Sequence, residues 1–270
     1  GQCEACLVGR YVRCKKFYSY GSMISCQDPP HLFGAYADYL YIHPRAMVHP
    51  IGEDISPEAG VLISAVFGNA VRWLGDVGKL TFGQSVAIVG PGQQGIAGAL
   101  VAKESGAEPV VVIGLSRDRQ RLETARRFGA DAVINSEADD PVQAVSKLTN
   151  GKMADVVMDV TGSPAGASAA LSLAGAGATV VLPGLYGPET RVPLMLDRAV
   201  LNEMRLLGVF SHDFRAVDKA ISLVRKGKYP LEEMISHRFP LEKAEEAVKL
   251  VGGEGETLPL KVVLDPAISQ

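Results

Sequence analysis

The chain has 270 residues, of which 47% are hydrophobic and 21% charged, and its formal net charge is −3. This composition is that of a globular protein and excludes disordered, collagen-like and fibrous chains. It lacks the excess of Lys and Arg that a broad nucleic-acid surface needs, so we expect no nucleic-acid partner. No apolar run reaches the roughly 18 residues of a membrane helix and no signal peptide is recognisable, so we expect a cytoplasmic protein without membrane contact.

All four cysteines stand near the beginning of the chain, where Cys3, Cys6 and Cys14 follow a C-x2-C-x7-C pattern and Cys26 comes later. A disulfide scaffold would spread its cysteines, and a chain of this length needs no such scaffold. Closely spaced thiolates in a turn-rich segment are typical ligands of zinc, which accepts soft sulfur ligands in a tetrahedral site. The spacing therefore predicts a zinc site, with free thiols or one incidental cysteine pair as the alternative.

The first 80 residues are rich in Tyr, Pro and His, and prolines at 29, 30, 44 and 50 limit any helix there to a short segment. An apolar stretch opened by Pro57 predicts one or two helices over 57–78. From residue 85, short apolar runs alternate with segments of helical spacing. Strands are predicted at 85–89, 108–113, 132–134, 156–160, 179–182 and 205–209, and helices at 93–105, 119–128, 141–148 and 165–174.

These strands are continuously apolar rather than alternating, which is typical of strands buried on both faces of a parallel sheet. Their alternation with helices predicts a doubly wound α/β domain. Beyond residue 210, helices at 214–226 and 241–251 and a strand at 260–264 leave this rhythm. We expect this last part of the chain to pack with the N-terminal region as a second domain.

The first strand of the regular region runs into a G-x-G-x-x-G loop. Its residues are Gly90, Pro91, Gly92, Gln93, Gln94 and Gly95. In such a loop the first glycine permits a tight turn, the second lets the backbone approach a pyrophosphate, and the third lets the helix pack against the strand. Because a strand precedes the loop and a helix follows it, the motif predicts a dinucleotide site at the helix N-terminus. A glycine-rich turn without a ligand is the alternative.

An acidic residue about 20 positions after this motif usually binds the ribose 2′-hydroxyl of NAD. Here the second strand ends at Ser116 and Arg117, with Arg119 and Arg121 behind them and no carboxylate at the strand tip. A guanidinium would hold a 2′-phosphate by charge-assisted hydrogen bonds, which predicts NADP rather than NAD. The alternative is that these arginines are solvated helix charges, paired with Asp118 and Glu123, and that the site accepts NAD without selectivity.

Besides the cysteine pattern and the Gly90 loop, five short segments stand out. They are residues 34–39 (GAYADY), 67–71 (FGNAV), 128–131 (FGAD), 159–162 (DVTG) and 261–266 (KVVLDP). Together they resemble, over nearly the whole chain, the zinc-dependent medium-chain dehydrogenase/reductases, which include alcohol, polyol and threonine dehydrogenases. The resemblance implies a β-barrel-type (GroES-like) catalytic domain interrupted by a Rossmann dinucleotide-binding domain. We therefore expect a partial catalytic domain at 1–78, a Rossmann domain at 79–210 and a return to the catalytic domain at 211–270.

The resemblance also implies further site residues and a homo-oligomer, because the family commonly forms dimers or tetramers. Thr161 would lie beside the cofactor and Pro183 with Gly184 near the nicotinamide, although Pro183–Gly184 is also consistent with a simple turn after a strand. His212 follows the sixth predicted strand and could lie near the nicotinamide end. All five histidines, His212 included, lack metal spacing, and a surface or packing position is expected for each.

In the family, a structural zinc is held by four cysteines spaced C-x2-C-x2-C-x7-C. Cys3, Cys6 and Cys14 match the second to fourth of these, and the first would precede Gly1, so the site is incomplete in this chain unless Cys26 substitutes. The family's catalytic zinc ligands fall upstream of the lobe or near 63–66, where this sequence reads Ile-Ser-Ala-Val. No catalytic residue can therefore be assigned, and the chain is expected to lack its N-terminal part.

The resulting prediction is an oxidoreductase that transfers a hydride between a nicotinamide cofactor and a small alcohol, polyol or carbonyl. One alternative is a truncated, catalytically inactive dinucleotide-binding fragment. A second is a zinc-free, quinone-reductase-like enzyme, against which the cysteine pattern argues.

Overall fold

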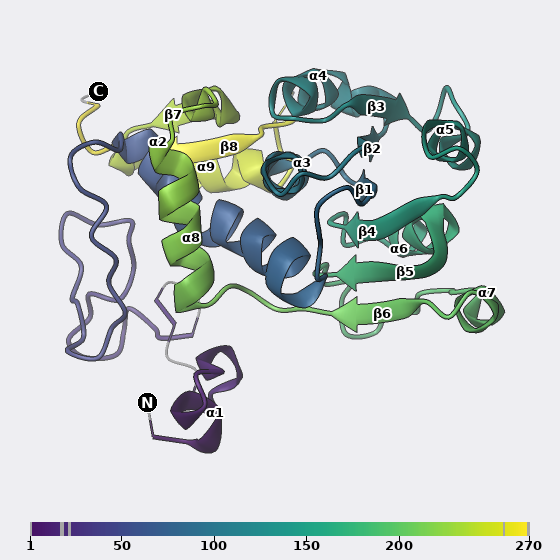
Figure 1. The fold of residues 1–270 in the computed structure, drawn as a ribbon. Helices are drawn as coiled ribbons and strands as arrows, with labels where there is room; N and C mark the ends of the chain where they lie inside the picture. The colour runs from purple at the N-terminus through teal and green to yellow at the C-terminus, as the bar shows by residue number, and fades with distance from the viewer. Residues whose placement is uncertain (1, 17–18, 21–22, 256, 269–270) are drawn as a thin grey trace. The chain divides into compact units, whose positions relative to one another are not determined.

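A computed structural model describes residues 2–16, 19–20, 23–255 and 257–268 of the chain (Figure 1). The chain divides into two compact units, one formed by Gly1–Glu58 with Leu231–Gln270 and the other by Ala59–Pro230. Within the described ranges, no helix combines the length and the apolar character that crossing a membrane would require.

The larger unit contains a six-stranded sheet in which every neighbouring pair of strands is parallel. The strands are β1 (Val86–Val89), β2 (Val110–Gly114), β3 (Ala132–Asn135), β4 (Ala154–Asp159), β5 (Ala174–Leu182) and β6 (Arg205–Gly208). Their order is β3-β2-β1-β4-β5-β6, which confirms the predicted Rossmann arrangement (Figure 1). The order reverses between β1 and β4, and ligands of such sheets bind outside the carboxyl ends of the strands at this reversal.

Burial explains why the strands could be predicted from apolar runs. β1 and β2 are buried along their whole length, whereas the edge strand β6 is only partly buried. The largest difference from prediction is at β5, which begins five residues earlier than the run at 179–182. The added residues, 174–178, are all Ala or Gly, and these small side chains carry no strand signal.

Helices cover both faces of the sheet, and small residues allow their close approach. Val145 and Leu171 pack with Ala87 of β1 in one core cluster. Gly98 lies against the opposite face, because a Cβ placed there would meet Ile88 of β1 at 3.2 Å. The helices are α3 (Gln93–Glu104), α4 (Arg119–Arg127), α5 (Pro141–Leu148) and α6 (Pro164–Leu173).

Local chemistry fixes where two of these helices begin. The Asp140 carboxylate accepts a hydrogen bond of 2.8 Å from the amide two residues further on, and Pro141 is the first residue of α5. In α6, the Ser163 hydroxyl accepts one of 3.1 Å from the amide of Gly166, and Pro164 comes first. A capping oxygen followed by proline satisfies the free amides of a helix start and presets its first dihedral angle.

The predicted helical segment over 57–78 is confirmed, although its turns after Leu62 are π-helical. It consists of α2 (Pro57–Leu62), η2 (Ile63–Gly68) and η3 (Val71–Val77). Within the larger unit this segment packs with α8 (Phe214–Arg225) and the loop before it, where the Trp73 indole donates to the Ser211 carbonyl over 3.0 Å. The domain boundaries at 78 and 210 remain predictions, because compactness alone does not define a catalytic domain.

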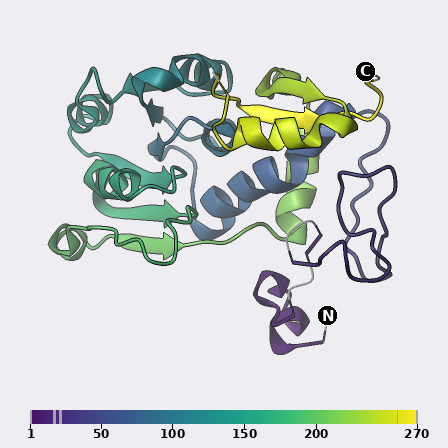
Figure 2. The same ribbon diagram turned by 180° about the vertical axis from the view of Figure 1, so that it is seen from behind.

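The smaller unit contains a two-stranded parallel sheet of β7 (Ile235–Phe239) and β8 (Lys261–Leu264). Figure 2 shows α9 (Ala244–Val251) running alongside β8 in the yellow part of the chain near its C-terminus. The sequence predicted α9 and β8. It missed β7, in which Ser, His and Arg separate the apolar ends, and the short helices α1 (Glu4–Leu7) and α7 (Leu196–Leu201).

Candidate functional site

The glycine loop follows β1, at the point where the strand order reverses. Gly90 has φ +105°, a value that L side chains rarely adopt, and its amide donates to the Ile113 carbonyl of β2 over 2.9 Å. A Cβ on Gly95 would overlap the carbonyl oxygen of Gly90, so only glycine fits there. By contrast, a Cβ on Gly92, the N-cap of α3, would meet nothing within 4 Å. The loop is thus tightly packed at Gly95 and open at Gly92, as binding of a pyrophosphate requires.

Two buried oxygen atoms in the first turn of α3 have no hydrogen-bond donor among the described residues. They are the side-chain Oε1 atoms of Gln93 and Gln94. The Gln94 amide nitrogen is engaged, because it donates to the Ala65 carbonyl over 2.7 Å. A buried acceptor without a donor costs about 1–3 kcal/mol. The first turn of α3 therefore holds two buried acceptors whose donors are not among the described residues.

On the other side of the reversal, β4 ends in Asp159, whose side chain is fully buried. Its carboxylate accepts hydrogen bonds from the Thr161 amide (2.9 Å), the Thr161 hydroxyl (2.6 Å) and the Tyr186 hydroxyl (2.8 Å). Burial, and then the hydrogen bond to Asp159, raise the pKa of Tyr186. This network holds Thr161 against the loop, where a Cβ on Gly90 would lie 3.0 Å from the Thr161 methyl group.

Pro183 and Gly184 directly follow β5 at the same carboxyl edge. A Cβ on Gly184 would lie 3.0 Å from the backbone of Gly162, so the two turns touch. The residues that the resemblance placed around the cofactor, Thr161 and Pro183–Gly184, therefore lie in one group with the Gly90 turn. Their role in binding stays a prediction.

At the tip of β2, Ser116 and Arg117 are exposed, as residues that contact the ribose of a bound cofactor would need to be. Arg121 is engaged differently, because its Nη1 lies 3.1 Å from Oδ1 of the buried Asp118. This is the pairing that the alternative interpretation of the arginines described. The tip also has a carboxylate that the sequence did not predict: the Ser116 amide donates to Oε2 of Glu137 over 2.7 Å.

Ser64, Asn69 and His212 form a second group of polar side chains, which the sequence analysis did not predict. It links the loop after β6 to the helical segment that contains η2. His212 Nδ1 lies 3.0 Å from the Asn69 side-chain oxygen, and His212 Nε2 lies 2.9 Å from the Ser64 hydroxyl. Because Asn69 uses its nitrogen to donate to the Ala65 carbonyl, its oxygen faces Nδ1 as an acceptor. In the neutral tautomer that carries its proton on Nδ1, Nε2 accepts the Ser64 hydroxyl proton. The same Ala65 carbonyl accepts from Gln94, so this group adjoins the first turn of α3.

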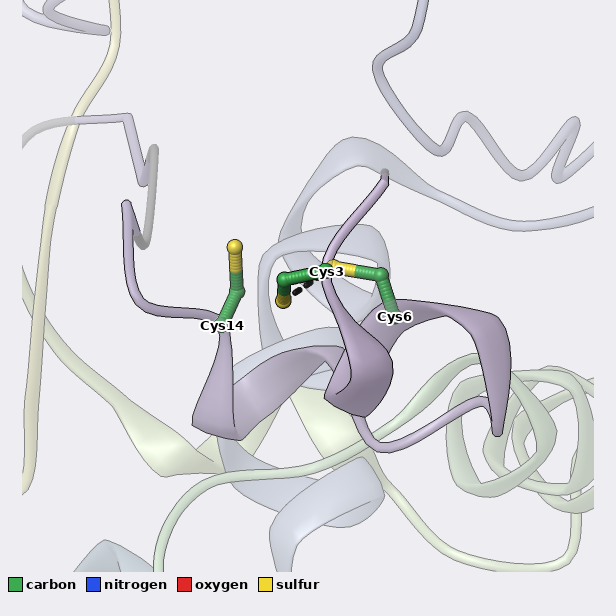
Figure 3. A group of neighbouring side chains, drawn as sticks. All are labelled: Cys3, Cys6 and Cys14. Atoms are coloured by element: carbon green, nitrogen blue, oxygen red, sulfur yellow. Dashed lines mark hydrogen bonds between the residues drawn. The ribbon is translucent and has the colours of Figure 1, made fainter.

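Cys3, Cys6 and Cys14 point toward one another in the N-terminal segment (Figure 3). Their sulfur atoms all lie within 4.8 Å of one another, and those of Cys3 and Cys6 are 3.5 Å apart. Hydrogen bonds from the backbone of Lys15 and of Cys6 lower the pKa of Cys3 to about 6, whereas hydrogen bonds to Cys14 and Cys3 raise that of Cys6.

Three thiols at these separations supply three of the four ligands of a zinc site. They form the only group of three or more potential metal ligands found among the residues that the structure describes, and Cys26 is not part of it. Substitution of Cys26 for the fourth cysteine, which the spacing left open, thus gains no support.

Comparisons with known proteins agree with this geometry. Residues 95–226 match the family model described as zinc-binding dehydrogenase. A Mycobacterium tuberculosis (strain H37Rv) protein named probable alcohol dehydrogenase is 37% identical over 264 residues, which cover 96% of this chain and 71% of the relative. The chain belongs to the zinc-binding dehydrogenase family.

Other proteins similar to this zinc-binding dehydrogenase are also named as dehydrogenases. The L-threonine 3-dehydrogenase of Bacillus licheniformis is 32% identical over 93% of this chain and 68% of its own length. The crystal structure of an alcohol dehydrogenase from Thermotoga maritima superposes with a TM-score of 0.90 at 26% identity, covering 98% of this chain and 72% of that one. The predicted class, a nicotinamide-dependent oxidoreductase of the alcohol dehydrogenase type, is confirmed.

Sequence reasoning missed three of the contacts that shape this site in the dehydrogenase: Glu137 on Ser116, His212 on Ser64, and Tyr186 on Asp159. Of these, only the contact between Glu137 and Ser116 follows from the pairing of adjacent strands. Gly114 and Asn135, the last residues of β2 and β3, are register partners, so polar residues just after both strands must meet. The other two join segments whose proximity depends on loops of irregular course.

Proposed function

We propose that this dehydrogenase binds a nicotinamide dinucleotide across the Gly90 loop and exchanges a hydride with a small alcohol, polyol or carbonyl compound. The observation that supports this most strongly is the first turn of α3. There the side of Gly92 is open, Gly95 is closed against Gly90, and two buried glutamine oxygens lack donors among the described residues. When bound, the nicotinamide supplies the hydride acceptor or donor.

The chain's own residues would then have distinct tasks. The free amides at the start of α3 would bind the pyrophosphate, and Thr161 with Pro183 and Gly184 would position the nicotinamide half. His212 Nε2 would accept a hydrogen bond from the Ser64 hydroxyl. This pair could then take up the proton that an alcohol loses on oxidation. Cys3, Cys6 and Cys14 would hold a zinc ion whose contribution is to order the N-terminal segment.

We further propose that Arg117 favours NADP(H) over NAD(H). Arg117 is exposed at the tip of β2 and α4 begins two residues later, so its guanidinium can approach a phosphate on the ribose. A structural neighbour described as a zinc-binding dehydrogenase from Sinorhizobium meliloti 1021 bound to NADP has a TM-score of 0.86 and 26% identity. That neighbour supports the proposal without deciding it.

Parallel calorimetric titrations of the chain with NADPH and NADH test both proposals. Tighter binding of NADPH supports the dinucleotide site and the preference. Equal or tighter binding of NADH overturns the preference and keeps the site. Binding of neither cofactor overturns the proposed function, and Gly92→Val serves as the variant that must not bind.

A second candidate function is cofactor binding without turnover by this chain. It is favoured by one observation: among the described residues, the cysteine group is the only set of three or more potential metal ligands. Steady-state assays of the zinc-loaded chain with a panel of primary, secondary and polyhydric alcohols separate the two candidates. Turnover above that of the Gly92→Val variant excludes the second, and cofactor binding with no turnover on any alcohol supports it.

A further inference from the structure

The tip of β2 receives a carboxylate from the neighbouring strand. Glu137 stands two residues beyond the end of β3, and its Oε2 accepts a hydrogen bond of 2.7 Å from the Ser116 amide. Asn135, the last residue of β3, donates from its side chain to the Ser116 hydroxyl over 3.0 Å. The Ser116 amide is therefore already bonded to Glu137, and the Ser116 hydroxyl to the last residue of β3.

This carboxylate is ionised at neutral pH. The backbone hydrogen bond from Ser116 lowers the pKa of Glu137 most, followed by the hydrogen bond from the Ser116 side chain and by the positive charge of Arg117. The tip of β2 thus bears one negative and one positive side chain, both exposed and both adjacent to Ser116. The sequence around the end of β2 contains the positive charge of Arg117, whereas the negative charge of Glu137 comes from the segment after β3.

The two charges act in opposite directions on a ribose substituent. A 2′-phosphate carries nearly two negative charges near neutral pH, so Arg117 attracts it and Glu137 repels it. To reach the Ser116 amide, a phosphate would also have to displace the Glu137 carboxylate from that donor. A 2′-hydroxyl meets neither difficulty, because it can donate a hydrogen bond to the carboxylate. Specificity commonly depends on such a repulsive element as well as on an attractive one.

We propose that Glu137 is a specificity-determining residue that opposes the 2′-phosphate of NADP(H) and limits the preference created by Arg117. The inference rests on the proposed dinucleotide site. It assigns the choice of cofactor to two neighbouring strands rather than to the tip of β2 alone. Its consequence is that removing one negative charge, without adding a new contact, should strengthen the binding of NADPH.

The test is the variant Glu137→Gln, which keeps an oxygen acceptor for the Ser116 amide and removes the charge. Asp139→Asn is the matched control, because Asp139 is an exposed carboxylate two residues further along the same loop. Dissociation constants for NADPH and NADH are measured by calorimetry on the full chain, at low and at high salt. We expect Glu137→Gln to shift the ratio of the two constants toward NADPH by about fivefold at low salt. The shift should shrink at high salt, and Asp139→Asn should leave the ratio within about twofold.

Two outcomes overturn the inference while both cofactors still bind: an unchanged ratio in Glu137→Gln, or an equal shift in Asp139→Asn, which would reveal only a general charge effect. If the unchanged chain binds neither cofactor, the proposed function itself fails and this inference fails with it. A circular dichroism melt identical to that of the unchanged chain confirms that a changed ratio reflects the site and not the fold.

Discussion

The Gly90 loop and the cysteine cluster differ in how they are assembled. The loop stands at the ends of buried strands, and its contacts involve β2 and the turn after β4. The cysteine cluster is formed by residues 3–14 alone, where neither α1 nor the turn Tyr11–Arg13 has a buried residue. One site is thus supported by a hydrophobic core, and the other has only its own ligands to order it. We expect the first to form without a ligand and the second to depend on its metal.

The largest effect should come from closing the open side of the loop. In Gly92→Val the added Cβ meets no protein atom within 4 Å, and the side chain would occupy the space in which a pyrophosphate would lie. We expect the affinity for NADPH to fall by about 100-fold or more, with an unchanged melting temperature. Gly95→Ala is the contrasting variant, since its Cβ overlaps the Gly90 carbonyl and should lower the melting temperature. Normal NADPH binding by Gly92→Val would remove the loop from the site.

The cysteine cluster gives the next largest effect. Cys14→Ser replaces one of three sulfur ligands, and we expect zinc affinity to fall by about 30-fold while NADPH affinity stays within about twofold. Hydrogen exchange should then quicken in residues 2–16 and remain unchanged in β1 and β2. Cys26→Ser is the control, because Cys26 lies outside the cluster. Faster exchange throughout the sheet of Cys14→Ser would contradict the proposed independence of the two sites.

A smaller effect is expected at the tip of β2. Arg117→Asp replaces the attractive charge by a repulsive one, so the ratio of dissociation constants should move toward NADH by about tenfold. Arg119→Asp, two residues away and also exposed, should move it much less. Parallel titrations with NADPH and NADH measure both variants. A shift of similar size in the two would mean that only the net charge of the region matters.

The smallest effect concerns the ion pair between Lys228 and Glu104, the last residue of α3. Lys228 lies 2.6 Å from Glu104 and, by its hydrogen bond, lowers the pKa of that carboxyl more than Tyr229 or Lys226 does. A carboxyl whose pKa is lowered by folding stabilises the fold above its unfolded pKa, and the contribution is lost as the pH falls through the folded value. We expect Glu104→Gln to cost less than about 1 kcal/mol at pH 7. Urea titrations should show the difference vanish in acid, and a difference that grew there would contradict the assignment.

Much of this architecture could be predicted from local sequence. The continuous apolar runs of β1 and β2 identified strands that are buried on both faces. The helices predicted at 141–148 and 165–174 are α5 and α6, and α6 begins one residue earlier than predicted, at Pro164. The G-x-G-x-x-G loop is local as well, because its glycines are required by the backbone of six consecutive residues. Where the signal was weak, the reason is visible: the Ala and Gly residues that begin β5 are residue types depleted in strands.

The sequence by itself thus determined the parallel sheet, the Gly90 loop and the cysteine cluster, since each depends on periodicity or on the spacing of near neighbours. Only the tertiary structure decided which side chains from distant segments meet at the carboxyl edge. Ser64 and His212 are 148 positions apart, and Asp159 and Tyr186 are 27 apart. Glu137 reaches Ser116 because the register of two parallel strands brings their ends together. A hydrogen bond depends on separations in space of about 3 Å, and chain spacing alone does not fix such separations across loops.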